Sequence, residues 1–192
     1  MPQPDHVMDL ELPSEDTLPE DLRPYWQKCK DKLGFVPNVL RAWSLRPDKL
    51  RTFIASYNEL MLGPSGLSKL EREMIAVAVS AANRCYYCLV AHGAAVRQLS
   101  EDPELGEMLV MNYRVAELPV RQRVMLDFVV KLTETPHLIT HEDRAGLSGQ
   151  GFSDADIFDI AEVAGFFNMT NRVAHAVDMM PNRDYHAQAR KP

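Results

Sequence analysis

Apolar residues recur every three or four positions through most of the chain, which is the spacing of an amphipathic helix. The first such face comprises Leu22, Tyr25, Trp26, Cys29 and Leu33. Gly34 follows directly and predicts the end of that helix, because glycine adopts the left-handed conformation of a helix C-terminus without strain. No segment alternates apolar and polar residues between turn signals, as a half-buried strand does. The pattern therefore predicts an all-α protein.

Capping signals divide the rest of the chain into helices. In three places a hydroxyl residue is followed three positions later by an acid, which is the pattern of a helix start: Ser68 with Glu71, Thr140 with Asp143, and Ser153 with Asp156. Together with prolines and glycines as breaks, they predict helices over residues 22–33, 37–45, 47–62, 69–83, 85–99, 102–112, 119–133, 141–149 and 154–179.

One helical domain is expected over residues 19–180, with a less regular segment on each side. Residues 1–18 carry prolines such as Pro2 and Pro4 and no helical period, so they predict an extended N-terminal arm that either wanders or lies across a partner subunit. Residues 181–192 also lack periodicity and predict a C-terminal tail. A chain of 192 residues is long enough to bury a substantial core.

The charge balance restricts the partners. The chain has 21 Lys and Arg against 27 Asp and Glu, a net charge of −6 with histidine neutral. An acidic chain without a basic stripe repels phosphate backbones and anionic lipid, so we expect neither a nucleic-acid nor a membrane partner. The most apolar stretch, residues 74–82, is too short to span a bilayer. We see no secretory signal, and three cysteines do not suggest a secreted disulfide scaffold, so we expect a cytoplasmic protein.

The segment CYYCLVAH, residues 85–92, carries the candidate chemistry. On a helix, Cys85, Cys88 and His92 form one stripe with neighbouring Cβ atoms about 5–6 Å apart. A disulfide needs Cβ atoms about 3.5–4.5 Å apart, so closure is easiest if Cys85 lies at the helix boundary, where its backbone need not be helical. The positive end of the helix favours a thiolate, so the pair can ionise, attack and close on itself.

A proton carrier accompanies the two thiols. His92 follows Cys88 by one helical turn, and peroxide reduction needs such a group because the alkoxide or hydroxide leaving the O–O bond takes up a proton. The turn at Asn83 and Arg84 folds the preceding helix back antiparallel. We therefore expect Glu73 on that helix to face the Cys/His stripe.

Simpler interpretations exist for each of these residues. A CxxC pair often binds zinc, but a structural zinc site takes four ligands, and the sequence offers no second CxxC or helical histidine pair. We therefore predict no metal and no cofactor. A single histidine is more often a packed or surface residue, and Glu73 beside Arg72 is by spacing alone more often a solvated charge. Cys29 is interpreted as a small apolar residue on its helix face.

The stretch EREMIAVAVSAANRCYYCLVAHGAAVR resembles the signature of the alkyl hydroperoxidase D-like family, within the carboxymuconolactone decarboxylase superfamily. That signature is a glutamate, an apolar helix and then Cys-x-x-Cys-x-x-x-His. Its four key positions are Glu73, Cys85, Cys88 and His92 in this sequence. Residues 118–176 are similar to the second half of the branch called peroxidase-related proteins. Together the two resemblances cover most of residues 35–178.

The resemblance implies a function for each of these residues. Cys88 would be the attacking thiol that becomes a sulfenic acid, and Cys85 the proton donor and resolving partner. His92 and Glu73 would complete the proton relay. The family implies an all-helical homo-oligomer, commonly a trimer or hexamer, with the site near a subunit contact. It also implies a cofactor-free antioxidant enzyme, whose partners are a hydroperoxide substrate and a dithiol or protein disulfide reductant.

The sequence departs from the family pattern at Tyr87. The best-characterised members have a histidine immediately before the second cysteine. A phenol has a pKa near about 10, so it hydrogen-bonds but is a poor proton shuttle at neutral pH. This position bears on the strength of the peroxidase activity, though not on the disulfide chemistry. The lactone decarboxylases of the superfamily lack the cysteine pair, so its presence argues against that reaction.

Polar residues within the apolar final helix form a second feature: Asn168, Asn171 and Arg172. We interpret them as a buried hydrogen-bond network that fixes helix packing or an interface. The functional alternative is that they line a pocket beside Cys88.

Three functions remain open from the sequence. The first is a thiol peroxidase or disulfide oxidoreductase that uses Cys85 and Cys88. The second is a non-catalytic redox sensor or assembly protein that uses the same dithiol. The third and weaker one is a metal-dependent enzyme with Cys, Cys, His and Glu ligands.

Overall fold

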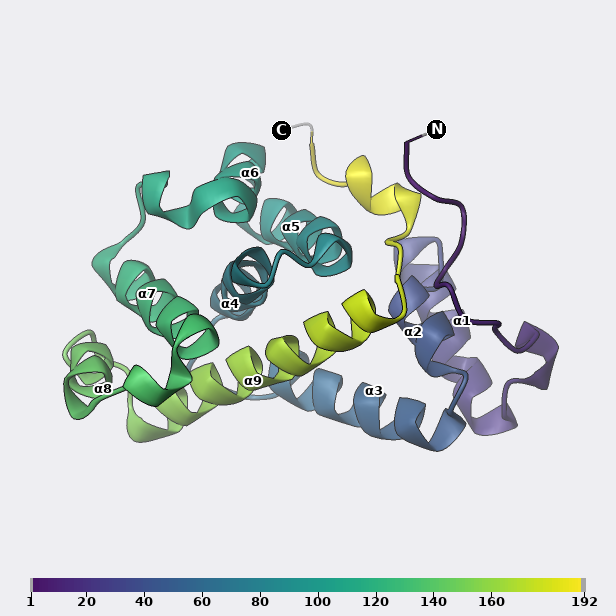
Figure 1. Ribbon diagram of the computed structural model, residues 1–192, viewed down its shortest axis with the longest axis horizontal. Coiled ribbons are helices and arrows are strands. Elements are labelled where there is room, and N and C mark those ends of the chain that lie inside the picture. The colour runs from purple at the N-terminus through teal and green to yellow at the C-terminus, as the bar shows by residue number, and fades with distance from the viewer. Residues whose placement is uncertain (1, 191–192) are drawn as a thin grey trace.

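The computed structural model describes residues 2–190, and within them every regular element is a helix or a 3-10 turn (Figure 1). The α-helices are α1 (Arg23–Leu33), α2 (Asn38–Trp43), α3 (Pro47–Leu62), α4 (Lys69–Ala82), α5 (Tyr86–Ser100), α6 (Pro103–Asn112), α7 (Val120–Glu134), α8 (His141–Ser148) and α9 (Asp154–Ala176). The 3-10 turns are η1 (Glu15–Thr17), η2 (Glu20–Leu22), η3 (Tyr113–Val115), η4 (Pro136–Leu138) and η5 (Arg183–His186). The all-α prediction is confirmed.

Helix boundaries lie close to the predicted ones, with α3 matching at both ends. The last helix is the exception, because it ends at Ala176 and not near Met179. Asp178 adopts a left-handed conformation with φ 48°. The Met179 N–H then donates to the Ala174 carbonyl at 2.9 Å, as in a Schellman cap. Backbone hydrogen bonds thus cap the carbonyls at the end of α9. No glycine marks this helix end in the sequence.

Helix α4 forms the centre of the main core. Residues 74–79 of α4 are at most 1% exposed, because α5, α6, α7 and α9 all pack against this helix. Figure 1 shows α9 crossing the molecule from α7 and α8 toward the α1–α3 group. A separate apolar cluster lies among α1, α2 and α3 and includes Trp26, Leu50 and Phe53. None of the helices in the described part of the chain is long and apolar enough to cross a membrane.

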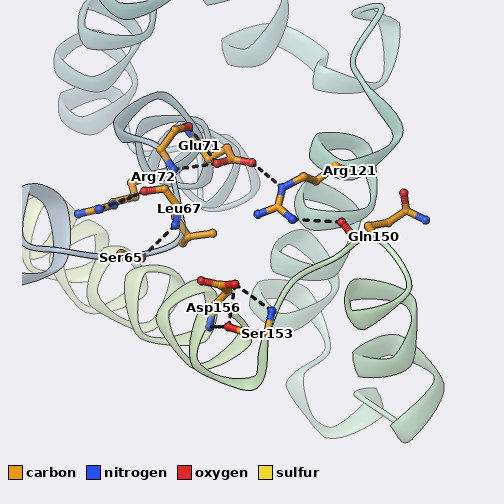
Figure 2. A network of polar contacts seen from close by, with 9 residues as sticks. Ser65, Leu67, Glu71, Arg72, Arg121, Gln150, Ser153 and Asp156 are labelled. Carbon is orange, nitrogen blue, oxygen red and sulfur yellow. Dashed lines mark hydrogen bonds and ion pairs between the residues drawn. The ribbon is translucent and has the colours of Figure 1, made fainter.

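A polar junction fixes the starts of α4 and α9 (Figure 2). Glu71 accepts a hydrogen bond from the Ser68 backbone N–H at 2.8 Å and pairs with Arg121 of α7 at 3.2 Å. The buried Arg72 guanidinium donates to the carbonyls of Leu60, Gly63 and Leu67, which holds the α3–α4 loop in place. The Ser153 capping box with Asp156 starts α9 in the same way. These contacts orient α4, whose next turn carries Glu73.

The two chain ends pack on each other. The predicted N-terminal arm follows the segment after α9 in this structure. Asp9 N–H donates to Val177 O at 2.9 Å, and Met180 N–H donates to Val7 O at 3.0 Å. The Gln3 side chain reaches Pro181 O. The predicted tail contains η5, which contacts α5.

Candidate active site

The CxxC motif lies at the start of α5, with Cys85 as the N-cap residue. Its φ of −83° and ψ of 101° are extended, as a boundary position permits. Arg84 before it is left-handed with φ 55°, and this turn reverses the chain between α4 and α5. Both cysteines are free thiols, 1% and 3% exposed for Cys85 and Cys88.

The two thiols interact as a pair. A hydrogen bond from Cys88 lowers the pKa of Cys85 from its ordinary 9.0 to about 6, with help from the Cys88 backbone N–H and the charges of His175 and His92. The same hydrogen bond and burial raise the pKa of Cys88 well above its ordinary value. The pair therefore holds one proton at neutral pH, which is the state in which a dithiol is reactive.

Glu73 and His92 form a second pair across the α4–α5 contact. The Glu73 Oε2 and His92 Nδ1 atoms are 2.6 Å apart, and the two side chains are only 11% and 12% exposed. The His92 ring also meets Phe167 edge-on, with ring centroids 4.6 Å apart. A buried carboxylate at this distance fixes the orientation of the imidazole. The structure thus brings together the acid and the base that the sequence singled out.

A cavity of about 230 Å³ lies beside the thiols. Cys88, Glu73 and His92 all line it, whereas Cys85 does not. A small molecule in the cavity therefore meets Cys88 first, with Cys85 behind it. The rest of the wall is mainly apolar and aromatic, and includes Phe53, Tyr57, Tyr87, Phe166, Phe167 and Tyr185.

The polar residues of α9 hydrogen-bond to α4 and to the turn before α5. Asn83 Nδ2 donates to Asn171 Oδ1 at 2.9 Å, and Asn171 Nδ2 donates to Ser80 Oγ at 3.0 Å. Asn171 and Ser80 are fully buried, and their side chains also hydrogen-bond the Cys88 sulfur, which partly offsets the rise in its pKa. Asn168 bonds Thr133 and accepts from Arg172, away from the cavity. This arrangement favours the packing interpretation of these residues.

Sequence reasoning missed several residues around the cavity. Tyr57 of α3, Tyr185 of η5 and Cys29 of α1 line it, although they are far from the motif in the chain. Tyr57 belongs to the apolar face of a helix, which signals burial but not a cavity. Tyr87 accepts a hydrogen bond from the Val39 N–H at 2.9 Å, and burial raises its pKa well above the ordinary value. Sequence reasoning also did not single out His175, whose charge helps to lower the Cys85 pKa. Its place near the end of α9 is the only hint in the sequence.

No group of three or more His, Cys, Asp or Glu side chains in residues 2–190 is arranged to hold a metal ion.

Comparison with known proteins gives consistent similarities. The model of the carboxymuconolactone decarboxylase family matches residues 47–127. The chain is 61% identical to an uncharacterized peroxidase-related protein from Silicibacter sp. TM1040, with a TM-score of 0.95 over 99% of this chain and 100% of that one. It is 41% identical to an uncharacterized peroxidase-related protein from Ralstonia eutropha JMP134, described as an alkylhydroperoxidase AhpD core, with a TM-score of 0.95 over 98% and 100% of the two chains.

A more distant structure shares the fold alone. The debrominase Bmp8 is 18% identical, with a TM-score of 0.77 over 96% of each chain. None of the curated proteins compared with the chain matches it.

Proposed function

Because the chain belongs to the carboxymuconolactone decarboxylase superfamily, and within it to the alkyl hydroperoxidase D-like, peroxidase-related proteins, we propose that it is a thiol peroxidase. It reduces hydroperoxides through Cys85 and Cys88 and serves antioxidant defence. The observation that carries this proposal is the cavity that Cys88 lines together with the Glu73–His92 pair. A nucleophile, its proton-sharing partner and a proton donor are thus within reach of one bound molecule.

In the first step, the proton shared by the pair moves to Cys85 and leaves a thiolate on Cys88. The Cys88 sulfur attacks the terminal oxygen of ROOH, the S–O bond forms and the O–O bond breaks. The sulfur loses two electrons, and the alkoxide RO⁻ takes a proton to leave as ROH. Cys88 is now a sulfenic acid, which the Cys85 sulfur attacks to form the disulfide and release water.

Counting the exchangeable hydrogens shows what the Glu73–His92 pair contributes. The products ROH and water contain three exchangeable hydrogens, of which the hydroperoxide supplies one and the thiol pair one. The third comes from outside the pair. His92, held by Glu73 at 2.6 Å and facing the same cavity, is the group that supplies it. A dithiol or protein disulfide reductant then returns two electrons and restores both thiols. We further propose that the enzyme works as a cytoplasmic homo-oligomer, a trimer or hexamer.

The test is thiol titration of the reduced protein against an organic hydroperoxide. Wild type is expected to lose two thiols per chain and to turn over repeatedly with dithiothreitol. Cys88→Ser is expected to lose all turnover, whereas Cys85→Ser stops at a sulfenic acid that dimedone traps. Cys29→Ser is the control for the number of thiols, and it should still lose two thiols per chain. Normal turnover by Cys88→Ser rules out this mechanism.

The redox-sensor alternative uses the same two cysteines, so the same experiment separates the two functions. A sensor undergoes one stoichiometric oxidation and then stops, even with excess dithiol. An enzyme continues until the hydroperoxide is exhausted.

A further inference from the structure

Two hydroxyl groups in the cavity have no function in the mechanism above. Tyr57 and Tyr185 both line it, and neither hydroxyl has a hydrogen-bond partner among residues 2–190. The other two tyrosines of the wall are paired: Tyr25 donates to Asn58 Oδ1 at 3.1 Å, and Tyr87 accepts from Val39. The Tyr57 and Tyr185 hydroxyls are therefore free to hydrogen-bond a ligand in the cavity.

Both tyrosines line the same cavity as the Glu73–His92 pair. Burial is the main cause that raises the pKa of Tyr57 and Tyr185, and the negative charge of Glu73 is the next. Both phenols therefore remain protonated at neutral pH and are able to donate hydrogen bonds. The cavity thus has two hydrogen-bond donors besides the proton relay.

The rest of the wall is a cluster of phenylalanine rings. Phe53 and Phe166 have ring centroids 5.5 Å apart, and Phe166 meets Phe167 edge-on at 5.5 Å. Such a surface packs well against a planar ring. The volume of about 230 Å³ is smaller than the range of about 300–1,000 Å³ typical of drug-sized ligands, so it suits a compact molecule better than a long acyl chain.

We propose that this cavity selects compact aromatic hydroperoxides, with Tyr57 and Tyr185 as the specificity-determining residues that donate hydrogen bonds to the oxygen atoms of the substrate. The phenylalanine cluster packs against the ring of the substrate. This assignment rests on the proposed function, because it takes Cys88 as the thiol that the substrate reaches. A site built to pair its own polar groups rejects a ligand that leaves them unpaired more strongly than it rejects a change of shape.

Binding to Cys88→Ser tests the assignment without turnover. The probes are 2-phenyl-2-propanol, which is the alcohol formed from cumene hydroperoxide, and isopropylbenzene, which has the same carbon skeleton without oxygen. We expect the alcohol to bind about tenfold more tightly in a titration followed by NMR. The double variant Tyr57→Phe/Tyr185→Phe in the same background is expected to lose most of that preference. Equal affinity for both probes in Cys88→Ser overturns the proposal.

Tyr25→Phe is the matched control, since the Tyr25 hydroxyl is already committed to Asn58. It should keep the preference for the alcohol. Circular dichroism checks folding. If Cys88→Ser or the double tyrosine variant unfolds, the same comparison is made with Cys88→Ala and with the two single tyrosine variants.

Kinetics on wild type separate the two proposals. If the alcohol preference is present but no hydroperoxide is turned over, the peroxidase function fails and the binding assignment stands. If cumene hydroperoxide and hydrogen peroxide are reduced with equal KM and no alcohol preference is seen, the binding assignment fails alone.

Discussion

The cavity has two walls. They differ in whether their polar side chains already have a partner within the protein. The reactive wall consists of Glu73, Cys88 and His92, and each of these groups is paired with another side chain. The binding wall consists of Tyr57 and Tyr185, whose hydroxyls have no partner in the described residues. Paired groups are held in one geometry before substrate arrives, which suits chemistry. Unpaired donors keep their hydrogen bonds for a ligand, which suits recognition.

The two walls also differ in how the chain anchors them. The reactive wall belongs to α4 and α5, at the centre of the main core. Tyr185 lies near the C-terminus, where the buried Arg97 guanidinium donates to the carbonyls of Tyr185 and Gln188 at 2.9 and 3.0 Å. The Phe35 ring meets Tyr185 edge-on at 5.0 Å. Tyr185 is therefore held by contacts that the thiols do not share, so the two walls are separable by mutation.

The largest expected effect concerns the shared proton. Cys88→Ala removes the hydrogen bond that is the main cause of the low Cys85 pKa, so that pKa should rise from about 6 toward its ordinary 9.0. The ionisation constant then changes up to about a thousandfold, because each pH unit is a factor of ten. Cys88→Ser keeps a hydroxyl donor and should retain most of the shift. Thiolate absorbance against pH, in a Cys29→Ser background, measures both.

The same pair predicts a pH dependence with a definite sign. The Cys85 pKa is lower in the folded chain than the ordinary 9.0, so its contribution to stability is complete above pH 9 and is lost as pH falls toward about 6. The rate of peroxide reduction should fall as pH drops through about 6, because the pair then loses its thiolate. A thiolate titration centred near pH 9 in wild type contradicts this view of the pair.

A smaller effect is expected from the two neighbouring glutamates. Glu73→Gln removes the charge that orients and supports His92, and kcat/KM should fall about a hundredfold, as for loss of a general acid–base group. Glu71→Gln is the matched control, because Glu71 is equally buried but caps α4 and pairs with Arg121. It should lower the melting temperature and leave kcat/KM unchanged. Equal kinetic losses in both variants mean that Glu73 acts only through helix stability.

The reactive wall was accessible from sequence because it is local. Helical spacing places Cys88 and His92 on one face, and a single reversal at Arg84 brings Glu73 opposite them. The capping pairs likewise located the helix starts, since each is encoded within four residues.

The binding wall was not accessible, for an equally physical reason. Tyr57 and Tyr185 come from distant parts of the chain, and tertiary packing places both in the lining of the cavity. No periodic pattern in the sequence predicts this. Residues 181–190 have no hydrophobic repeat, and their place over α5 depends on carbonyl contacts to Arg97. The N-terminal arm was recognised as extended, but its contacts with Val177 and Met180 are backbone hydrogen bonds, which carry no side-chain signal.

A milder change targets the binding wall through its anchor. Arg97→Lys cannot reproduce a planar fork that reaches two carbonyls, so Tyr185 should lose its fixed position. We expect KM for cumene hydroperoxide to rise about fivefold with kcat nearly unchanged, because a loss of about 1 kcal/mol in binding corresponds to that factor. Arg190→Lys is the control, since Arg190 makes an exposed ion pair with Glu107. A fall in kcat without a change in KM shows that Arg97 serves the reactive wall instead.

The smallest kinetic effect is expected at Tyr87, which also lines the cavity. Its hydroxyl accepts from the Val39 N–H at 2.9 Å, and its pKa is raised well above the ordinary value, chiefly by burial. It is therefore not ionised at neutral pH and does not carry the proton that His92 supplies. Tyr87→Phe should leave the pH profile of turnover unchanged. It leaves a part-buried N–H unpaired, so the free energy of unfolding should fall by about 1–3 kcal/mol in urea denaturation. A shifted pH profile with unaltered stability shows instead that Tyr87 takes part in the proton relay and does not serve the stability of the fold.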